Sequence, residues 1–159
     1  MIQSDFNSAK IAEFLLHIKA IKLQPKDPFT WASGWKSPIY CDNRKILSHP
    51  QIRAEVRDQF INSIDNLANK PTAIAGVATG GIAIGALVAE KLNLPFCYVR
   101  SSAKAHGLTN QIEGGVNKDE KIIVIEDLIS SGKSSLAAVN ALENNSYNVI
   151  GLGAIFSYG

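Results

Sequence analysis

Apolar residues alternate between two patterns from about residue 72 onward. Four short runs, rich in apolar and β-branched residues, have the length and composition of strands: 73–77, 96–99, 121–125 and 149–156. Between them lie two stretches of helix length, one ending near Leu92 and one running from about Ser134 to Glu143. Strands that alternate with helices predict an α/β fold, in which a parallel sheet is covered on both faces. Ligands of such sheets bind beyond the carboxyl ends of the strands.

The N-terminal part of the chain has a different pattern. Apolar residues at helical spacing predict an amphipathic helix over about 5–20. The stretch that follows is rich in turn-forming residues, and short strands are expected at 29–31 and 39–41. A second helix is predicted to start at Pro50 with Ser48 as its cap. Its expected buried face consists of Ile52, Val56, Phe60 and Ile64.

Length and composition are those of one globular domain. The chain has 159 residues, of which 46% are hydrophobic and 19% are charged. A net charge of +2 argues against a nucleic acid or an anionic membrane surface as the partner. Residues 72–89 carry no charge, but their four glycines predict a strand, a turn and a helix rather than a membrane span. Cys41 and Cys97 fit no metal or redox spacing and suit a reducing cytoplasm.

The segment that begins with the strand 121–125 carries the most specific chemistry. Glu126 and Asp127 follow the strand, and small residues from Ser130 to Ser135 lead into a helix. The first turn of a helix offers free N–H groups and a positive dipole end, which bind phosphate. Carboxylates beside a phosphate fit a ligand that also offers sugar hydroxyls or a bound Mg²⁺. The pattern therefore predicts a site for a ribose phosphate.

Two other interpretations fit parts of the same segment. Gly132-Lys133-Ser134 matches the end of a nucleotide-binding P-loop, but that motif requires glycine at the position of Asp127. Alternatively, the polar end of the strand is simply solvated and a serine caps the following helix.

A long stretch from Arg100 to about Asp119 lacks regular periodicity and begins with cationic or protonatable groups. These groups are Arg100, Lys104 and His106. Connections of this length are often lids over active sites. Cations that close over a departing pyrophosphate would stabilise its charge, and a closed lid would exclude water. A histidine in a loop is equally explained as a solvated residue.

Aromatic and cationic residues also gather within residues 29–44. Lys36, Tyr40 and Arg44 suit a flat anionic ligand such as a pyrimidine carboxylate. A small aromatic core with solvated charges explains the same residues.

Taken in order, these segments resemble the type I phosphoribosyltransferases, and the orotate phosphoribosyltransferase family in particular. IIVIEDLISSGKSS (122–135) resembles the signature that binds 5-phosphoribosyl 1-diphosphate (PRPP), and RSSAKAHGLTNQIEGG (100–115) resembles the catalytic loop. FTWASGWKSPIYCDNR (29–44) resembles the hood over the base, and GVATGGI (76–82) resembles the pyrophosphate loop. Lys133, Ser101 and Ala32 depart from the residues common in the family.

The resemblance implies a type I phosphoribosyltransferase fold, with a mainly parallel sheet flanked by helices. A small N-terminal hood of about residues 1–48 would precede a core of about 49–159. The implied reaction transfers the phosphoribosyl group of PRPP to orotate in the presence of Mg²⁺, giving orotidine 5′-monophosphate and pyrophosphate. Family members continue beyond the position of Gly159, so the C-terminal part of the family fold is expected to be absent from this sequence.

The resemblance also implies roles for individual residues. Arg100, Lys104, His106 and Asp127 would form the catalytic set. PRPP would be bound by these four together with Thr79, Gly80, Glu126, Leu128, Ile129, Ser130, Ser131, Gly132, Lys133 and Ser134. Orotate would contact Ser130, Lys36, Tyr40 and Arg44. Mg²⁺ would be held through PRPP, with Asp127 as the candidate side chain, and loop 100–118 would be shared across a homodimer. The remaining alternatives are a phosphoribosyltransferase for another base and a non-catalytic sensor of PRPP.

Overall fold

The computed structural model describes residues 5–30, 34–101 and 111–158. A five-stranded sheet with the order β7-β6-β5-β8-β9 forms its centre. Its strands are β5 (Ala73–Val77), β6 (Phe96–Val99), β7 (Ile112–Glu113), β8 (Lys121–Ile129) and β9 (Asn148–Ser157). All neighbouring pairs are parallel except β6 and β7, which are antiparallel. The predicted α/β fold with a mainly parallel sheet is therefore confirmed.

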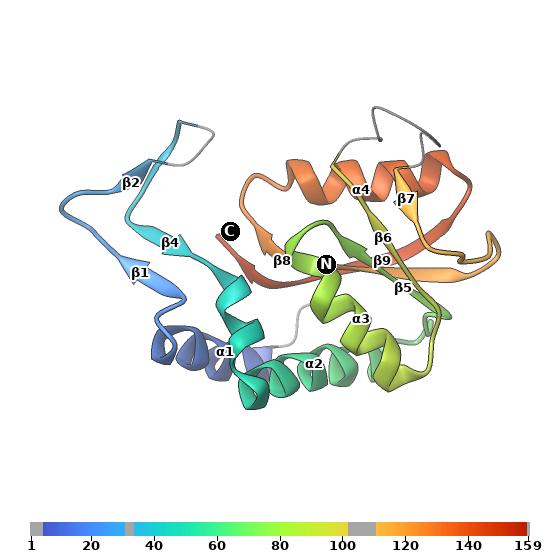
Figure 1. Cartoon of the computed structure of the whole chain (residues 1–159), viewed down its shortest axis with the longest axis horizontal. Helices are drawn as coiled ribbons and strands as arrows, with labels where there is room; N and C mark the ends of the chain where they lie inside the picture. Colours follow the sequence, from blue (N-terminus) through green and yellow to red (C-terminus); the bar gives the residue numbers. More distant parts are fainter. Residues whose placement is uncertain (1–4, 31–33, 102–110, 159) are drawn as a thin grey trace.

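Helices cover both faces of this sheet (Figure 1). One face is covered by α2 (Pro50–Asp65) and α3 (Gly80–Leu92), next to α1 (Asp5–His17), and the other by α4 (Lys133–Asn144). Alternation along the strands sorts the apolar side chains between the two layers. In β8, Ile123 and Ile125 join the core with α2 and α3, whereas Ile122 and Val124 join the core with α4.

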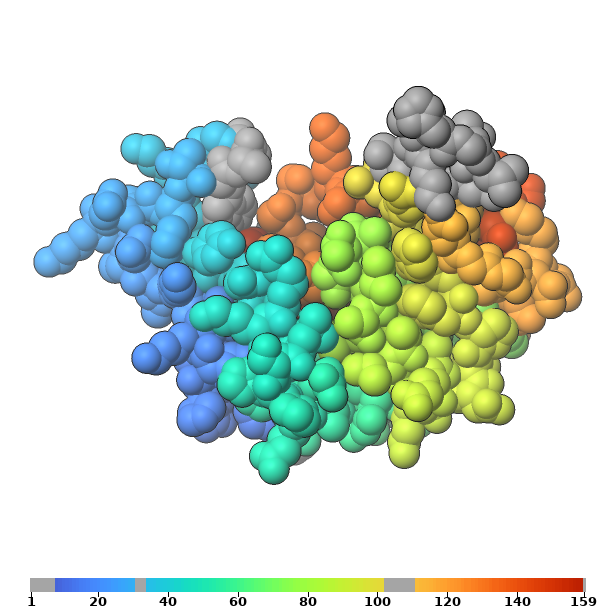
Figure 2. Space-filling view, in the orientation of Figure 1, coloured from blue at the N-terminus to red at the C-terminus, as the bar shows by residue number. Residues whose placement is uncertain are grey.

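The hood folds as two short antiparallel ladders beside the core. β1 (Ile21–Leu23) pairs with β4 (Ile39–Cys41), and β2 (Phe29–Thr30) pairs with β3 (Lys36–Ser37). A 3-10 helix, η1 (Asn43–Ser48), then leads into α2. In Figure 2 the surface is indented between the cyan part of the hood and the green and orange parts of the core.

Several predicted boundaries differ from the structure. β8 continues to Ile129 instead of ending at Ile125, because its ladder with β9 extends to the pair Ile129 and Ser157. The loop predicted after Arg100 contains β7, which pairs with β6. The cap of α2 is His49 instead of Ser48, which ends η1. On the predicted buried face of α2, Val56 and Ile64 are buried, while Ile52 and Phe60 are only half-buried.

Within the described ranges, no helix is both long enough and apolar enough to cross a membrane.

Candidate active site

The turn from β5 into α3 brings a glycine against a carboxylate. Thr79 is the N-cap residue of α3 and is exposed, and the peptide bond between Ala78 and Thr79 is cis. A Cβ atom added at Gly80 would overlap the carboxylate of Asp127 in β8. A residue with a side chain therefore cannot occupy this position unless Asp127 moves. Asp127, which is far from Thr79 and Gly80 in the sequence, thus meets them at the carboxyl ends of the strands.

Glu126, the other acid of β8, is directed toward α4 and is only 4% exposed. Its Oε2 accepts a hydrogen bond of 3.1 Å from the Ser135 hydroxyl, and its Oε1 accepts one of 3.0 Å from the backbone N–H of Asp127. Burial, followed by a hydrogen bond with the side-chain carboxyl of Asp127, raises the pKa of Glu126 to about 7, although the backbone N–H of Asp127 and the Ser135 hydroxyl act in the opposite direction. This carboxyl group therefore joins α4 to β8, and it is protonated more readily than an exposed glutamate.

The turn after β8 presents free amide groups, as its sequence predicts. Gly132 has a left-handed φ of 74° and is the N-cap residue of α4. None of the N–H groups of residues 130–134 donates a backbone hydrogen bond to another described residue. Ser130, Ser131, Lys133 and Ser134 are exposed. The start of α4 is therefore open to an anion.

Arg100 lies at the end of β6 and is held by β7. Its backbone N–H donates to Gln111 O over 2.9 Å, and Gln111 Nε2 donates to Arg100 O over 2.8 Å. Its guanidinium lies 3.7 Å from Glu113. A cavity of about 390 Å³ lies beside this arginine and extends to the first turn of α4. Its lining includes Arg100, Ser131, Lys133 and Ser134.

The predicted base-binding residues come from the hood. Tyr40 is 38% exposed, and its ring packs against Phe29 with a centroid distance of 5.5 Å. Lys36 is exposed in β3. Arg44 pairs through Nε with Asp42 over 2.7 Å. That hydrogen bond and the negative charge of Asp42 raise the pKa of the Arg44 guanidinium.

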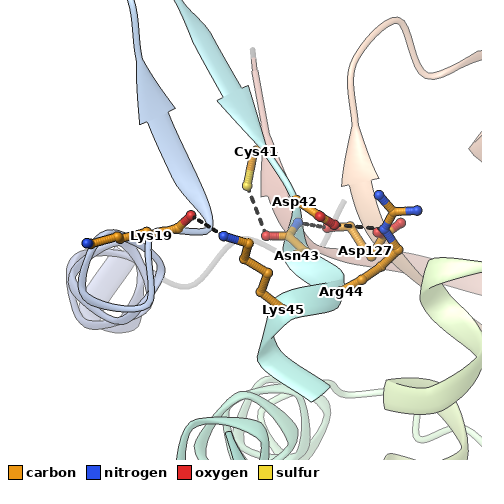
Figure 3. A network of polar contacts seen from close by, with 7 residues as sticks. All are labelled: Lys19, Cys41, Asp42, Asn43, Arg44, Lys45 and Asp127. Atoms are coloured by element: carbon orange, nitrogen blue, oxygen red, sulfur yellow. Dashed lines mark hydrogen bonds and ion pairs between the residues drawn. The ribbon is translucent and has the colours of Figure 1, made fainter. Parts of the chain in front are cut away.

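Two connections between hood and core were missed by sequence reasoning. The side chain of Asn43 donates a hydrogen bond of 2.6 Å to the backbone oxygen of Asp127, 84 residues away (Figure 3). The backbone N–H of Cys41 donates to the hydroxyl of Tyr158 over 3.0 Å. Neither Asn43 nor Tyr158 lies in a segment whose pattern indicates such a contact.

The structure thus brings together part of the predicted site. Asp127, Glu126, Gly80, Thr79 and the turn 130–134 meet at the carboxyl ends of β5 and β8, with Leu128 and Ile129 inside β8. Lys104 and His106 lie outside the described residues. In the described part of the chain, no group of three or more His, Cys, Asp or Glu side chains is placed to hold a metal ion.

Comparisons with known proteins match this sequence and fold. Residues 42–158 match the family model described as a phosphoribosyl transferase domain. The chain is 56% identical to orotate phosphoribosyltransferase from Porphyromonas gingivalis over 149 residues, which are 94% of this chain and 71% of that protein. It is 53% identical to the Bacillus pumilus enzyme of the same name over 150 residues, again 94% of this chain and 71% of that protein.

A solved structure gives the same result at the level of the fold. The crystal structure of orotate phosphoribosyltransferase from Aeropyrum pernix superposes with a TM-score of 0.79 at 27% identity, covering 94% of this chain and 82% of that one. Fold, site and sequence together define a phosphoribosyltransferase. Within that class, the chain belongs to the orotate phosphoribosyltransferase family of type I phosphoribosyltransferases.

Proposed function

We propose that this chain transfers the 5-phosphoribosyl group from PRPP to orotate, giving orotidine 5′-monophosphate and pyrophosphate, a step of pyrimidine biosynthesis. The observation that carries the proposal is the meeting of Asp127, Gly80 and the turn 130–134 at the carboxyl ends of β5 and β8. A carboxylate beside a set of free amides suits a ligand that carries hydroxyls and a phosphate on one sugar. The identity to orotate phosphoribosyltransferases supports orotate as the base.

PRPP would lie across the carboxyl ends of β5 and β8. Asp127 and Glu126 would bind the ribose hydroxyls, and Glu126 would do so only after its present hydrogen bonds rearrange. The free amides and hydroxyls of 130–134, following Leu128 and Ile129, would bind the 5-phosphate. The turn formed by exposed Thr79 and half-buried Gly80 would face the pyrophosphate.

The chemical step separates charge. N1 of orotate attacks C1 of the ribose while the bond from C1 to the pyrophosphate oxygen breaks. The N1 proton is released to the departing pyrophosphate or to solvent, and the departing group carries the negative charge. Arg100, Lys104 and His106 would stabilise that charge. Orotate would lie under the hood against Tyr40, with Lys36 and Arg44 near its carboxylate and Ser130 at its other side.

Mg²⁺ fits the donor set of the site. The carboxylate oxygens of Asp127 are hard ligands of the kind that Mg²⁺ prefers, although most of its ligands would come from PRPP. The ion would neutralise negative charge on the pyrophosphate group.

The proposal includes an assembly and a location. Loop 100–118 would reach the site of a second copy in a homodimer. The chain would form one domain, with the hood at about 1–48 and the core at about 49–159. Its two free, buried cysteines suit a reducing cytoplasm.

The test is the loss of orotate absorbance when PRPP and Mg²⁺ are added to purified protein. Asp127→Asn should lower turnover roughly a hundredfold, since the ribose loses the group that positions it. Asp65→Asn is the matched control, because Asp65 ends α2, which leads to the amino end of β5, opposite the carboxyl ends that form the site. If another base is turned over faster than orotate, the chain is a phosphoribosyltransferase for that base instead. Binding of PRPP without any turnover would indicate a sensor instead.

A further inference from the structure

Both ends of the Asn43 side-chain amide are engaged inside the protein. Asn43 is 3% exposed and begins η1, directly after β4 and Asp42. Its Nδ2 donates to the backbone oxygen of Asp127 over 2.6 Å, and its Oδ1 lies 3.0 Å from the sulfur of Cys41 (Figure 3). A backbone carbonyl only accepts hydrogen bonds, so the nitrogen of the amide must face Asp127.

The thiol of Cys41 then fixes the other end of the amide. With Nδ2 on Asp127, Oδ1 faces the sulfur and accepts a hydrogen bond from the S–H group of Cys41. Burial, followed by the negative charges of Asp127 and Asp42, raises the pKa of Cys41 to about 12. The thiol therefore keeps its proton at neutral pH and remains a donor.

The backbone carbonyl of Asp127, which Asn43 binds, lies in the part of β8 that no longer pairs with β5. The pairing of β5 with β8 ends at Gly76 and Ile125, two residues before Asp127. On the other side, β9 continues to pair with β8 as far as Ile129. The amide of Asn43 thus supplies a donor to a carbonyl that β5 no longer reaches.

The side chain of Asp127 is also restricted, because its carboxylate lies against Gly80. Backbone and side chain of this acid are therefore held from two directions, by the hood and by the turn before α3.

The same stretch of hood carries residues assigned to the base. Tyr40 and Arg44 flank Cys41 to Asn43, and the backbone N–H of Cys41 is itself bound to Tyr158 at the end of β9. A displacement of Asn43 would therefore move Tyr40 and Arg44, which are assigned to orotate, relative to Asp127, which is assigned to the ribose.

We propose that Asn43, oriented by the thiol of Cys41, is a positioning residue that sets the place of the base-binding hood relative to Asp127. The role rests on the proposed function, because it acts on the alignment of orotate with the ribose of PRPP. Reacting atoms must meet in a narrow range of distance and direction, so a small relative shift lowers the rate and weakens binding of both substrates.

The test compares steady-state constants of four variants. Asn43→Ala removes the amide, and Cys41→Ala removes only the donor that orients it. Cys41→Ser keeps a donor of similar size. Asn145→Ala is the matched control, because its Nδ2 also binds a backbone carbonyl, that of Ala141, at the far end of α4.

Asn43→Ala should lower kcat/KM for both substrates roughly tenfold, equivalent to about 1.4 kcal/mol, with a higher KM for each. Cys41→Ala should also lower kcat/KM and raise KM, but by less than Asn43→Ala does. Cys41→Ser and Asn145→Ala should retain the wild-type values. A purely structural role would reduce the amount of folded enzyme and hence the apparent kcat, while KM stayed constant. If Asn43→Ala does not fold, the contrast between Cys41→Ala and Cys41→Ser decides.

Hydrogen exchange provides a readout that does not need turnover. PRPP with Mg²⁺ should slow exchange in peptides covering residues 36–48 of the wild type, and this protection should be largely lost in Asn43→Ala. Wild-type turnover with unchanged KM values in a folded Asn43→Ala variant overturns the positioning role and leaves the proposed function intact. A wild type that neither binds PRPP nor consumes orotate overturns both.

Discussion

The buried carboxyl group of Glu126 leads to a measurable dependence of stability on pH. Its pKa rises from the ordinary 4.5 to about 7 in the folded protein. The folded state therefore binds this proton more tightly than the unfolded chain does. The resulting stabilisation is complete below the unfolded pKa near 4.5 and is lost as the pH rises through about 7. A shift of this size corresponds to roughly 3 kcal/mol of stabilisation.

Glu126→Gln removes this titration while keeping the shape of the side chain. Its amide oxygen can accept from the N–H of Asp127, and its amide nitrogen can donate to the Ser135 hydroxyl. We expect the variant to lose the decline in stability between about pH 5 and pH 8, and to be the more stable protein at pH 8. Ser135→Ala should move the decline to higher pH, because the hydroxyl favours the charged carboxylate.

Urea unfolding without PRPP, measured from pH 4.5 to 8.5, gives the free energy of unfolding at each pH. The two proteins differ only in this side chain, so the difference between wild type and Glu126→Gln isolates the carboxyl group. Parallel curves for the two proteins over this range would refute the reasoning.

Three further predictions concern single positions. Gly80→Ala should lower kcat/KM for PRPP at least tenfold and lower the free energy of unfolding by about 1–3 kcal/mol, because its Cβ would overlap the carboxylate of Asp127. Gly115→Ala is the control: a Cβ there meets nothing within 4 Å, so the unfolding midpoint should not change. Lys104→Ala should reduce kcat about a hundredfold with an unchanged circular dichroism spectrum, and an equal kcat would contradict its assigned role. Burial raises the pKa of Cys41 to about 12 and that of Cys97 to about 11, so both should react with iodoacetamide far more slowly in the native protein at pH 8 than in urea.

The central sheet could be predicted because its inner strands are apolar on both faces, and β5 is buried throughout. Such strands appear as unbroken apolar runs, and the bounds of β5 and β6 agree with the prediction. The end of β8 could not be found in this way. After Ile125 the acids Glu126 and Asp127 interrupt the apolar run, but the ladder with β9 depends on backbone groups, which the side-chain pattern does not report. β7 has two residues, too few to show any period.

The site was predictable in its chemistry and only partly in its geometry. Serines and glycine before a helix predicted the open turn at 130–134. The inward direction of Glu126 could have been predicted from strand alternation. Glu126 lies on the same face of β8 as Ile122 and Val124, which pack toward α4. The contact between Asn43 and Asp127 spans 84 residues and leaves no periodic trace in the sequence. It depends on how the hood folds back on the sheet.

The short ladder between β6 and β7 also has a practical consequence for protein engineering. Arg100 and Gln111 exchange two hydrogen bonds, so the ends of the connection between them are fixed by their own contacts with the sheet. The entropy of closing a loop grows only slowly with its length, by about 0.6 kcal/mol for each doubling. A peptide inserted between these two anchors should therefore leave the sheet intact, so changes in the length of this connection can be studied without loss of the fold.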